Sequence, residues 1–215
     1  YKRIQFLYDI ETNNDGKTKM PEVANIQIKN LSFKYNGEKE NILENINLNI
    51  PSGSFIGILG KTGSGKTTLA NILAKFYEIP SGKIFFNNVD INDIERKSFY
   101  EKFAYVMQDD YIYDNTIKHN IELYKNYDKN ELKEATEKAD LLETIEKLDE
   151  KYDTFIGDNG IKLSGGQKQR LILSRNLITT PDILIIDNGF TGLDIDTRKK
   201  VVDNLNNRNN KTTLV

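Results

Sequence analysis

The sequence predicts an α/β fold in which a parallel sheet carries an antiparallel β flank and a helical insertion. Three observations support this prediction. A buried strand over 55–59 runs directly into a glycine-rich loop and a helix over 66–77, the strand–loop–helix order of an α/β unit. A second apolar strand over 183–187 is typical of a strand buried on both faces of a parallel sheet. Residues 115–148 are heavily charged and helical in pattern, which predicts a separate helical lobe.

The other elements follow in chain order. Residues 1–22 are polar and rich in turn-forming residues. Alternating apolar residues predict antiparallel strands over 26–35 and 46–50. Three more elements complete the prediction: a strand with an Asn-Asn turn over 84–91, a helix over 196–206 and the start of a strand over 212–215.

Length and composition bound the possible functions. The 215 residues are enough for one domain with its own core. A formal net charge of -2 and a pI near 5.6 give no indication of a nucleic-acid surface, so no nucleic-acid partner is expected. The chain has no cysteine, which excludes disulfides and thiolate metal sites. Its apolar stretches are strand-sized, and it begins with Tyr1 rather than Met, so we expect a piece of a longer polypeptide.

Residues 60–68, Gly-Lys-Thr-Gly-Ser-Gly-Lys-Thr-Thr, match a complete phosphate-binding loop. Glycines allow the backbone N–H groups to point at a phosphate, and the following helix start adds positive potential. Lys66 would supply a cation to the β- and γ-phosphates, and the Thr67 hydroxyl would bind Mg²⁺. A chance glycine turn is the alternative, but the strand before and the helix after it favour the phosphate loop. The expected nucleotide contacts are Gly60, Thr62, Gly63, Ser64, Gly65, Lys66, Thr67 and Thr68.

A second glycine motif, Ser164-Gly165-Gly166-Gln167, follows Leu163 and opens a predicted helix that ends near 177. Its residues are expected to contact a nucleotide through the serine hydroxyl and backbone N–H groups, although Ser164 also suits a plain helix N-cap. One chain cannot easily bring both glycine motifs to one phosphate, whereas two copies facing head to tail could.

Together the two motifs resemble the nucleotide-binding domain of an ATP-binding cassette (ABC) transporter. The resemblance covers roughly residues 25–215 and implies a P-loop NTPase core with a helical signature-motif subdomain. It also implies a domain that binds ATP with Mg²⁺ and hydrolyses it. Such a domain pairs with a second nucleotide-binding domain and works with a transmembrane domain of the same polypeptide or complex.

The resemblance assigns roles to four further residues. Asp187 matches the Walker B carboxylate that holds the water shell of the metal, and Gln108 matches the Q-loop glutamine that senses the γ-phosphate, the metal and the transmembrane partner. Tyr35 resembles the aromatic residue that stacks on adenine, and Asp194 resembles the D-loop aspartate at the dimer interface. Simpler interpretations remain for two of them: Gln108 as a solvated residue after a strand, and Tyr35 as a half-buried strand residue.

Two segments favour an exporter. Residues 157–160, Gly-Asp-Asn-Gly, resemble the x-loop of exporters, and residues 1–9 resemble the link from the last membrane helix. We therefore predict a connector over 1–22 and a nucleotide-binding domain over 23–215, with its helical subdomain at about 109–175. That domain would lie on the cytoplasmic side of a membrane. The alternatives are the ATPase subunit of an ABC importer and, less favoured, a soluble ABC protein acting on ribosomes or DNA.

The sequence departs from the family where catalysis would occur. The family usually has a glutamate after the Walker B aspartate, but this chain has Asn188 there. An amide cannot act as a general base near neutral pH, so hydrolysis is expected to be weak. The chain also stops before the switch histidine that follows the strand at 212–215. We therefore predict a degenerate, low-activity site at Asn188, and a heterodimer is favoured over a homodimer.

Overall fold

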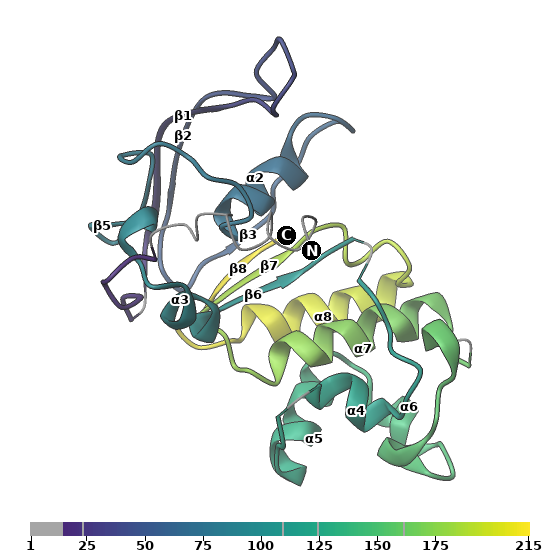
Figure 1. Cartoon of the computed structure of the whole chain (residues 1–215). Coiled ribbons are helices and arrows are strands. Elements are labelled where there is room, and N and C mark those ends of the chain that lie inside the picture. The colour runs from purple at the N-terminus through teal and green to yellow at the C-terminus, as the bar shows by residue number, and fades with distance from the viewer. Residues whose placement is uncertain (1–14, 23, 109, 124, 161) are drawn as a thin grey trace, which may run out of the picture.

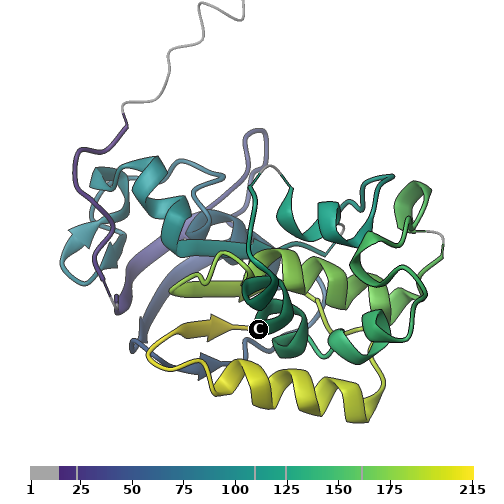
Figure 2. The same ribbon diagram turned by 90° about the horizontal axis from the view of Figure 1, so that it is seen from below.

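A computed structural model describes residues 15–22, 24–108, 110–123, 125–160 and 162–215 (Figures 1 and 2). The fold is α/β with a parallel and an antiparallel sheet, as predicted, and within the described residues each sheet has four strands. Residues 1–9, expected to resemble a link to a membrane helix, lie outside the described residues. Among the described residues, no helix combines the length and the apolar character needed to cross a membrane.

The antiparallel sheet has the order β2-β1-β4-β5. Its strands are β1 (Ile26–Phe33), β2 (Leu43–Ile50), β4 (Ile84–Phe86) and β5 (Val89–Asp90). The β1–β2 register shifts between Ile28 and Leu31, where Asn30 has a left-handed φ of 45°. Of the predicted bounds, 26–35 and 46–50, the start at Ile26 and the end at Ile50 are confirmed, but β1 ends at Phe33 and β2 begins at Leu43. The predicted strand over 84–91 is two short strands, β4 and β5, around the predicted Asn-Asn turn, and Ile91 already belongs to a 3₁₀ turn.

The parallel sheet has the order β3-β8-β7-β6. Its strands are β3 (Phe55–Ile56), β8 (Thr212–Leu214), β7 (Ile183–Ile186) and β6 (Phe103–Val106). All residues of β7 are buried, which explains why its sequence is continuously apolar. The β3 strand is shorter than the predicted 55–59, although the Ile58 N–H still donates to the Val215 carbonyl at 2.7 Å.

The two faces of the parallel sheet are covered by different helices. Helix α2 (Lys66–Leu73) shares one apolar cluster with Ile183 and Ile185 and with the antiparallel sheet. Helix α7 (Gly165–Leu177) and helix α8 (Ile195–Asn206) share the other cluster with Leu184 and Ile186, and Figure 1 shows both helices beneath the sheet. Helix α2 ends earlier than the predicted 66–77 because Lys75 adopts a left-handed φ of 60°.

The predicted helical stretch 115–148 is three separate helices. They are α4 (Ile117–Glu122), α5 (Lys129–Lys138) and α6 (Leu142–Glu146), and their buried residues join the cluster of α7. Leu123 and Asp140 break the stretch, with φ of 55° and 54°. Single helical turns of 3₁₀ type occur at η1 (Ile91–Asp93), η2 (Lys151–Asp153) and η3 (Asp158–Gly160), the last within the expected x-loop.

Helix α3 (Arg96–Lys102) was not predicted, and residues 15–20 pack against it. Asp15 Oδ1 accepts a hydrogen bond from the Arg96 N–H at 2.8 Å, and the Met20 N–H donates to Ser98 Oγ at 2.7 Å. A Cβ on Gly16 would lie 2.2 Å from the Asp93 carbonyl carbon, so this close approach requires glycine. Helix α3 continues without a break into β6.

Candidate functional site

The phosphate loop lies between β3 and α2, as predicted, and its glycines have identifiable roles. Gly63 and Gly65 have left-handed φ values of 80° and 88°. A Cβ on Gly65 would lie 2.6 Å from Leu43 Cδ2, and one on Gly60 would lie 2.6 Å from Ser64 Oγ. Gly63 and Gly65 thus hold left-handed conformations that other residues rarely adopt, and a side chain at Gly60 would require Ser64 to move.

The loop leaves the start of α2 open to an anion. The N-cap residue Gly65 provides no side-chain cap, and the first turn contains no acidic residue. Lys66 Nζ donates to the carbonyl oxygens of Gly60 and Lys61 at 2.9 and 3.0 Å, which holds the ammonium against the loop. An ammonium has three hydrogens, so one remains for a phosphate. Four further residues with predicted nucleotide contacts differ in exposure: Thr62, Ser64 and Thr67 are exposed, whereas Thr68 is buried.

Tyr35 lies beside this loop just after β1. Its hydroxyl is 2.8 Å from Thr68 Oγ1, and its ring meets the rings of Phe33 and Tyr77 edge to face, with centroids 5.3 Å apart in each pair. The Thr68 side chain is buried, and its hydroxyl is paired with the hydroxyl of Tyr35. The predicted stacking of Tyr35 on adenine stays a prediction.

Asp187 follows β7 at the carboxyl edge of the parallel sheet, where its N–H donates to the Val106 carbonyl at 2.9 Å. The Tyr105 hydroxyl lies 3.3 Å from Asp187 Oδ2 and 3.0 Å from Asn71 Oδ1. Burial raises the pKa of the Tyr105 hydroxyl, and the neighbouring Asp187 charge raises it further. The phenol is therefore a proton donor at neutral pH. Sequence analysis missed both Tyr105 and Asn71.

Asn188 and Gln108 share this edge of the sheet. The last paired residues of β6 and β7 are Val106 and Ile186. Gln108 lies two residues after Val106, Asn188 lies two residues after Ile186, and both side chains are exposed. Asn188 has a left-handed φ of 59°, a conformation that asparagine tolerates better than most residues. A Cβ on the next residue, Gly189, would lie 2.4 Å from Ile186 Cγ2, so the chain turns tightly here.

The second glycine motif opens α7 and caps itself. Ser164 Oγ accepts a hydrogen bond from the Gln167 N–H at 3.3 Å, and Gln167 Oε1 accepts one from the Ser164 N–H at 2.9 Å. This reciprocal pair is a capping box, so Ser164 does have the simple N-cap role. A Cβ on Gly165 would meet nothing within 4 Å, whereas one on Gly166 would lie 2.9 Å from the Gly192 carbonyl oxygen.

Helix α7 also holds the segment that contains Asp194. Gln169 Oε1 accepts from the Gly192 N–H at 3.0 Å, and Gln169 Nε2 donates to Thr191 Oγ1 at 3.2 Å. Asp194 caps α8 by accepting from the Thr197 N–H at 2.9 Å, and this hydrogen bond lowers the Asp194 pKa. The chain between the end of β7 and α8 is therefore fixed to the helix that carries the second motif.

A buried arginine joins α7 to the segment after Gln108. Arg175 donates to the Asn120 carbonyl and the Tyr111 carbonyl, both at 2.7 Å, and its Nη1 lies 3.3 Å from Asp110 Oδ1. These two carbonyl bonds fasten α4, at Asn120, and the segment after β6, at Tyr111, to the last turn of α7. Sequence analysis did not identify Arg175, because nothing in a helical apolar run shows which polar residue is buried.

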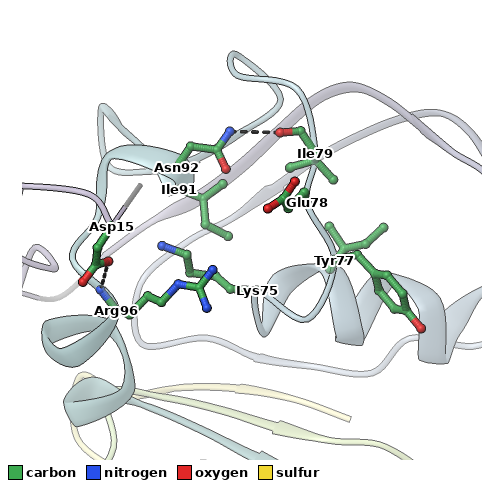
Figure 3. Close-up of a pocket in the computed structure, with 9 residues that line it drawn as sticks. Asp15, Lys75, Tyr77, Glu78, Ile79, Ile91, Asn92 and Arg96 are labelled. Atoms are coloured by element: carbon green, nitrogen blue, oxygen red, sulfur yellow. Dashed lines mark hydrogen bonds between the residues drawn. The ribbon is translucent and has the colours of Figure 1, made fainter. Parts of the chain in front are cut away.

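A separate cavity of about 260 Å³ lies at the other end of α2, away from the phosphate loop (Figure 3). Lys75 and Arg96 line it together with Asp15 and Glu78, so the charges are mixed. Lys75 Nζ donates to the Ile94 carbonyl at 2.7 Å, and burial lowers its pKa. Nothing in this lining favours a phosphate over a neutral or zwitterionic ligand.

The open helix start at the phosphate loop, with a carboxylate at the end of the neighbouring apolar strand, defines a P-loop nucleotide-binding domain. The self-capped Ser-Gly-Gly start on the opposite face of the sheet narrows this to the ATP-binding cassette class. The chain belongs to the ABC transporter family, whose sequence profile matches residues 43–191, more than half of the chain. Domains of this family bind ATP.

Among curated proteins, the chain is similar to the ATP-dependent lipid A-core flippases of Haemophilus influenzae and Vibrio vulnificus. It is 35% identical over 213 residues to that of H. influenzae strain 86-028NP, covering 97% of this chain and 36% of the relative. For V. vulnificus strain CMCP6 the identity is 34% over 214 residues, covering 97% and 37%. The chain thus spans about a third of the length of these relatives.

Among solved structures, the chain resembles a bacterial Atm1-family ABC exporter with ATP bound. The TM-score is 0.88 at 28% identity, and the likeness covers 99% of this chain and 38% of the other. The predicted resemblance to an exporter-type nucleotide-binding domain is confirmed by these relatives.

Proposed function

We propose that this chain is the nucleotide-binding domain of an ABC exporter, which binds ATP with Mg²⁺, pairs with a second such domain and drives transport. The observation that carries the proposal is the pair of glycine helix starts on opposite faces of one sheet. The start of α2 is open to an anion, whereas the start of α7, on the other face of the sheet, is exposed at Ser164 and Gly165. A head-to-tail pair of domains brings the second motif of one chain to the nucleotide of the other.

Exporter relatives support this proposal over an importer subunit. The likeness to the lipid A-core flippases covers 97% of the chain, so it includes most of the first 22 residues, the predicted connector. Several aromatic or long apolar side chains are exposed near Gln108 and the end of α2, as a docking surface for a transmembrane domain would require. They are Phe76, Tyr100, Met107, Tyr111 and Tyr113. The domain would face the cytoplasm.

The residues present fit a magnesium ion carried in with the nucleotide. Mg²⁺ usually takes one or two protein ligands and completes its shell with phosphate oxygens and water. The described residues contain no group of three or more His, Cys, Asp and Glu side chains that could hold a metal ion. Thr67 in the first turn of α2 and Asp187 at the end of β7 would hold the ion, with Gln108 at the same edge. The bound ion would neutralise charge on the β- and γ-phosphates.

Asn188 makes hydrolysis at this site slow. It occupies the position after Asp187 where the family usually has a glutamate, and its amide cannot take a proton from water at neutral pH. Loss of a general base costs about 10²–10⁴ in rate. We therefore propose that the domain holds ATP at a slow site, while its Ser164–Gln167 motif completes the competent site of a different partner domain. This arrangement is a heterodimer.

The first test compares ATP binding and turnover of the wild-type chain with those of Asn188→Glu, in the presence of Mg²⁺. We expect tight binding but slow turnover in the wild type, roughly 0.001–0.1 per second against an ordinary 10 per second. In a chain extended through the switch histidine, Asn188→Glu should raise turnover by about 10²–10⁴. Asn188→Gln is the matched control, since it has the length of glutamate but no basic oxygen. Ordinary turnover in the wild type, abolished by Lys66→Ala, would contradict the slow site.

A further inference from the structure

The Tyr105 hydroxyl contacts Asp187, yet the proposed function gives it no role. Tyr105 belongs to β6, and its side chain lies on the α2 face of the sheet, whereas its neighbours Ala104 and Val106 face α7. Its ring packs against the ring of Phe76 with centroids 5.8 Å apart. A phenylalanine ring would fill this space equally well, so packing does not require the hydroxyl. Only the hydroxyl oxygen reaches the carboxylate.

The hydroxyl lies between two groups, one on α2 and one after β7. Asn71 Oδ1 is 3.0 Å away and Asp187 Oδ2 is 3.3 Å away. A phenol has one proton and can donate to only one of them at a time, and an ionised carboxylate is the stronger acceptor. Flipping the Asn71 side-chain amide exchanges the positions of its NH₂ group and its carbonyl oxygen. The amide then donates to the phenol, and the phenol donates to Asp187.

We propose that Tyr105 is a positioning residue for Asp187: its O–H donates to Oδ2 and directs the remaining carboxylate oxygen toward the water shell of Mg²⁺. This role rests on the proposed function, because it requires a metal–nucleotide at the same edge. Hydrogen bonds to a carboxylate that holds a metal fix its orientation, and their loss typically lowers metal affinity about 10–100-fold.

The test measures metal affinity and nucleotide affinity separately in Tyr105→Phe. The 215-residue chain is loaded with a non-hydrolysable ATP analogue and titrated with Mn²⁺, a paramagnetic substitute for Mg²⁺, followed by electron paramagnetic resonance. Binding of a fluorescent ATP analogue in excess chelator gives the metal-free affinity. We expect about tenfold weaker Mn²⁺ binding and an unchanged metal-free affinity. Asn71→Ala should weaken Mn²⁺ binding less, because it removes only the group that orients the phenol.

Tyr100→Phe is the matched control. Its hydroxyl donates to the carbonyl of Ala74, the C-cap residue of α2, at 2.9 Å, but it does not contact Asp187. We expect both affinities of this variant to equal those of the wild type. Unchanged Mn²⁺ affinity in Tyr105→Phe, or equal losses in both affinities, would overturn the positioning role alone. A wild-type chain that binds no nucleotide would overturn the proposed function and, with it, this role.

Discussion

The starts of α2 and α7 are both glycine-rich, but they differ in whether a side chain caps their backbone N–H groups. The start of α2 has no side-chain cap, two left-handed glycines and a lysine held across the loop by two carbonyl bonds. The start of α7 has no left-handed glycine, and Ser164 and Gln167 cap each other. The first is shaped for an anion in advance, whereas the second is a stable helix end by itself.

This difference between the two helix starts predicts different roles for the two motifs. Unpaired N–H groups at a helix start attract a phosphate, so the α2 site can bind nucleotide in a single domain. At the start of α7 one of these groups already has a partner, and the Ser164 hydroxyl is already an acceptor. A phosphate from a second domain would have to compete with the capping box. Single-domain nucleotide binding should therefore depend on the first motif and dimer closure on the second.

Among substitutions in the two glycine motifs, the largest effect is expected from Lys66→Ala. Removing the ammonium should weaken ATP binding about 100-fold, since a desolvated charge pair contributes roughly 3 kcal/mol. The measurement is titration of a fluorescent ATP analogue into the single domain. Lys61→Ala is the control, because Lys61 lies in the same loop and is exposed. Comparable losses of ATP affinity in both variants would mean that the loop attracts phosphate only through its total positive charge. The α2 start would then not be specially shaped for an anion.

Replacing glycines within the first motif should separate the cost of a left-handed backbone from the cost of a steric clash at Cβ. Gly63 and Gly65 are both left-handed, but a Cβ on Gly63 meets nothing within 4 Å, whereas one on Gly65 lies 2.6 Å from Leu43 Cδ2. A left-handed alanine costs about 1–2 kcal/mol. We expect Gly63→Ala to lower the free energy of unfolding by about that amount and Gly65→Ala to lower it further. Urea denaturation measures both, and equal effects would show that Leu43 moves aside freely.

The smallest effect is expected at the second motif. Ser164→Ala should lower the free energy of unfolding by about 1 kcal/mol, because it removes an N-cap, and should leave ATP binding by the single domain unchanged. Ser164→Asp sharpens the test, since aspartate caps a helix well but repels a γ-phosphate. We expect it to retain stability and to lose ATP-dependent dimerisation, measured by analytical ultracentrifugation. Dimerisation equal to that of the wild type would mean that Ser164 acts only as a cap.

Sequence analysis predicted the α/β class and the position of both glycine motifs, because these depend on local patterns. The strand–loop–helix order, the apolar run of β7 and the cap before α7 are all set by neighbouring residues. Element ends were less predictable: Lys75 and Leu123 end helices through left-handed backbones that their residue types do not favour.

The missed site residues depend on tertiary contacts. In the sequence, Tyr105 looks like any tyrosine in an alternating strand. Only the pairing of β6 with β7 brings its hydroxyl to Asp187. Arg175 is buried because Asn120 and Tyr111 supply carbonyl oxygens from 55 and 64 residues away in the chain. No local pattern encodes such distances.

The close approach at Gly16 has a mechanical consequence. Residues 15–20 are attached to α3, which joins β6 directly, and β6 ends two residues before Gln108. No loop separates α3 from β6, and these two elements together span roughly 20 Å. A pull on the chain ahead of Asp15 would therefore be carried as tension to the edge of the sheet where Asp187 lies, and a bulkier residue at position 16 would loosen that attachment.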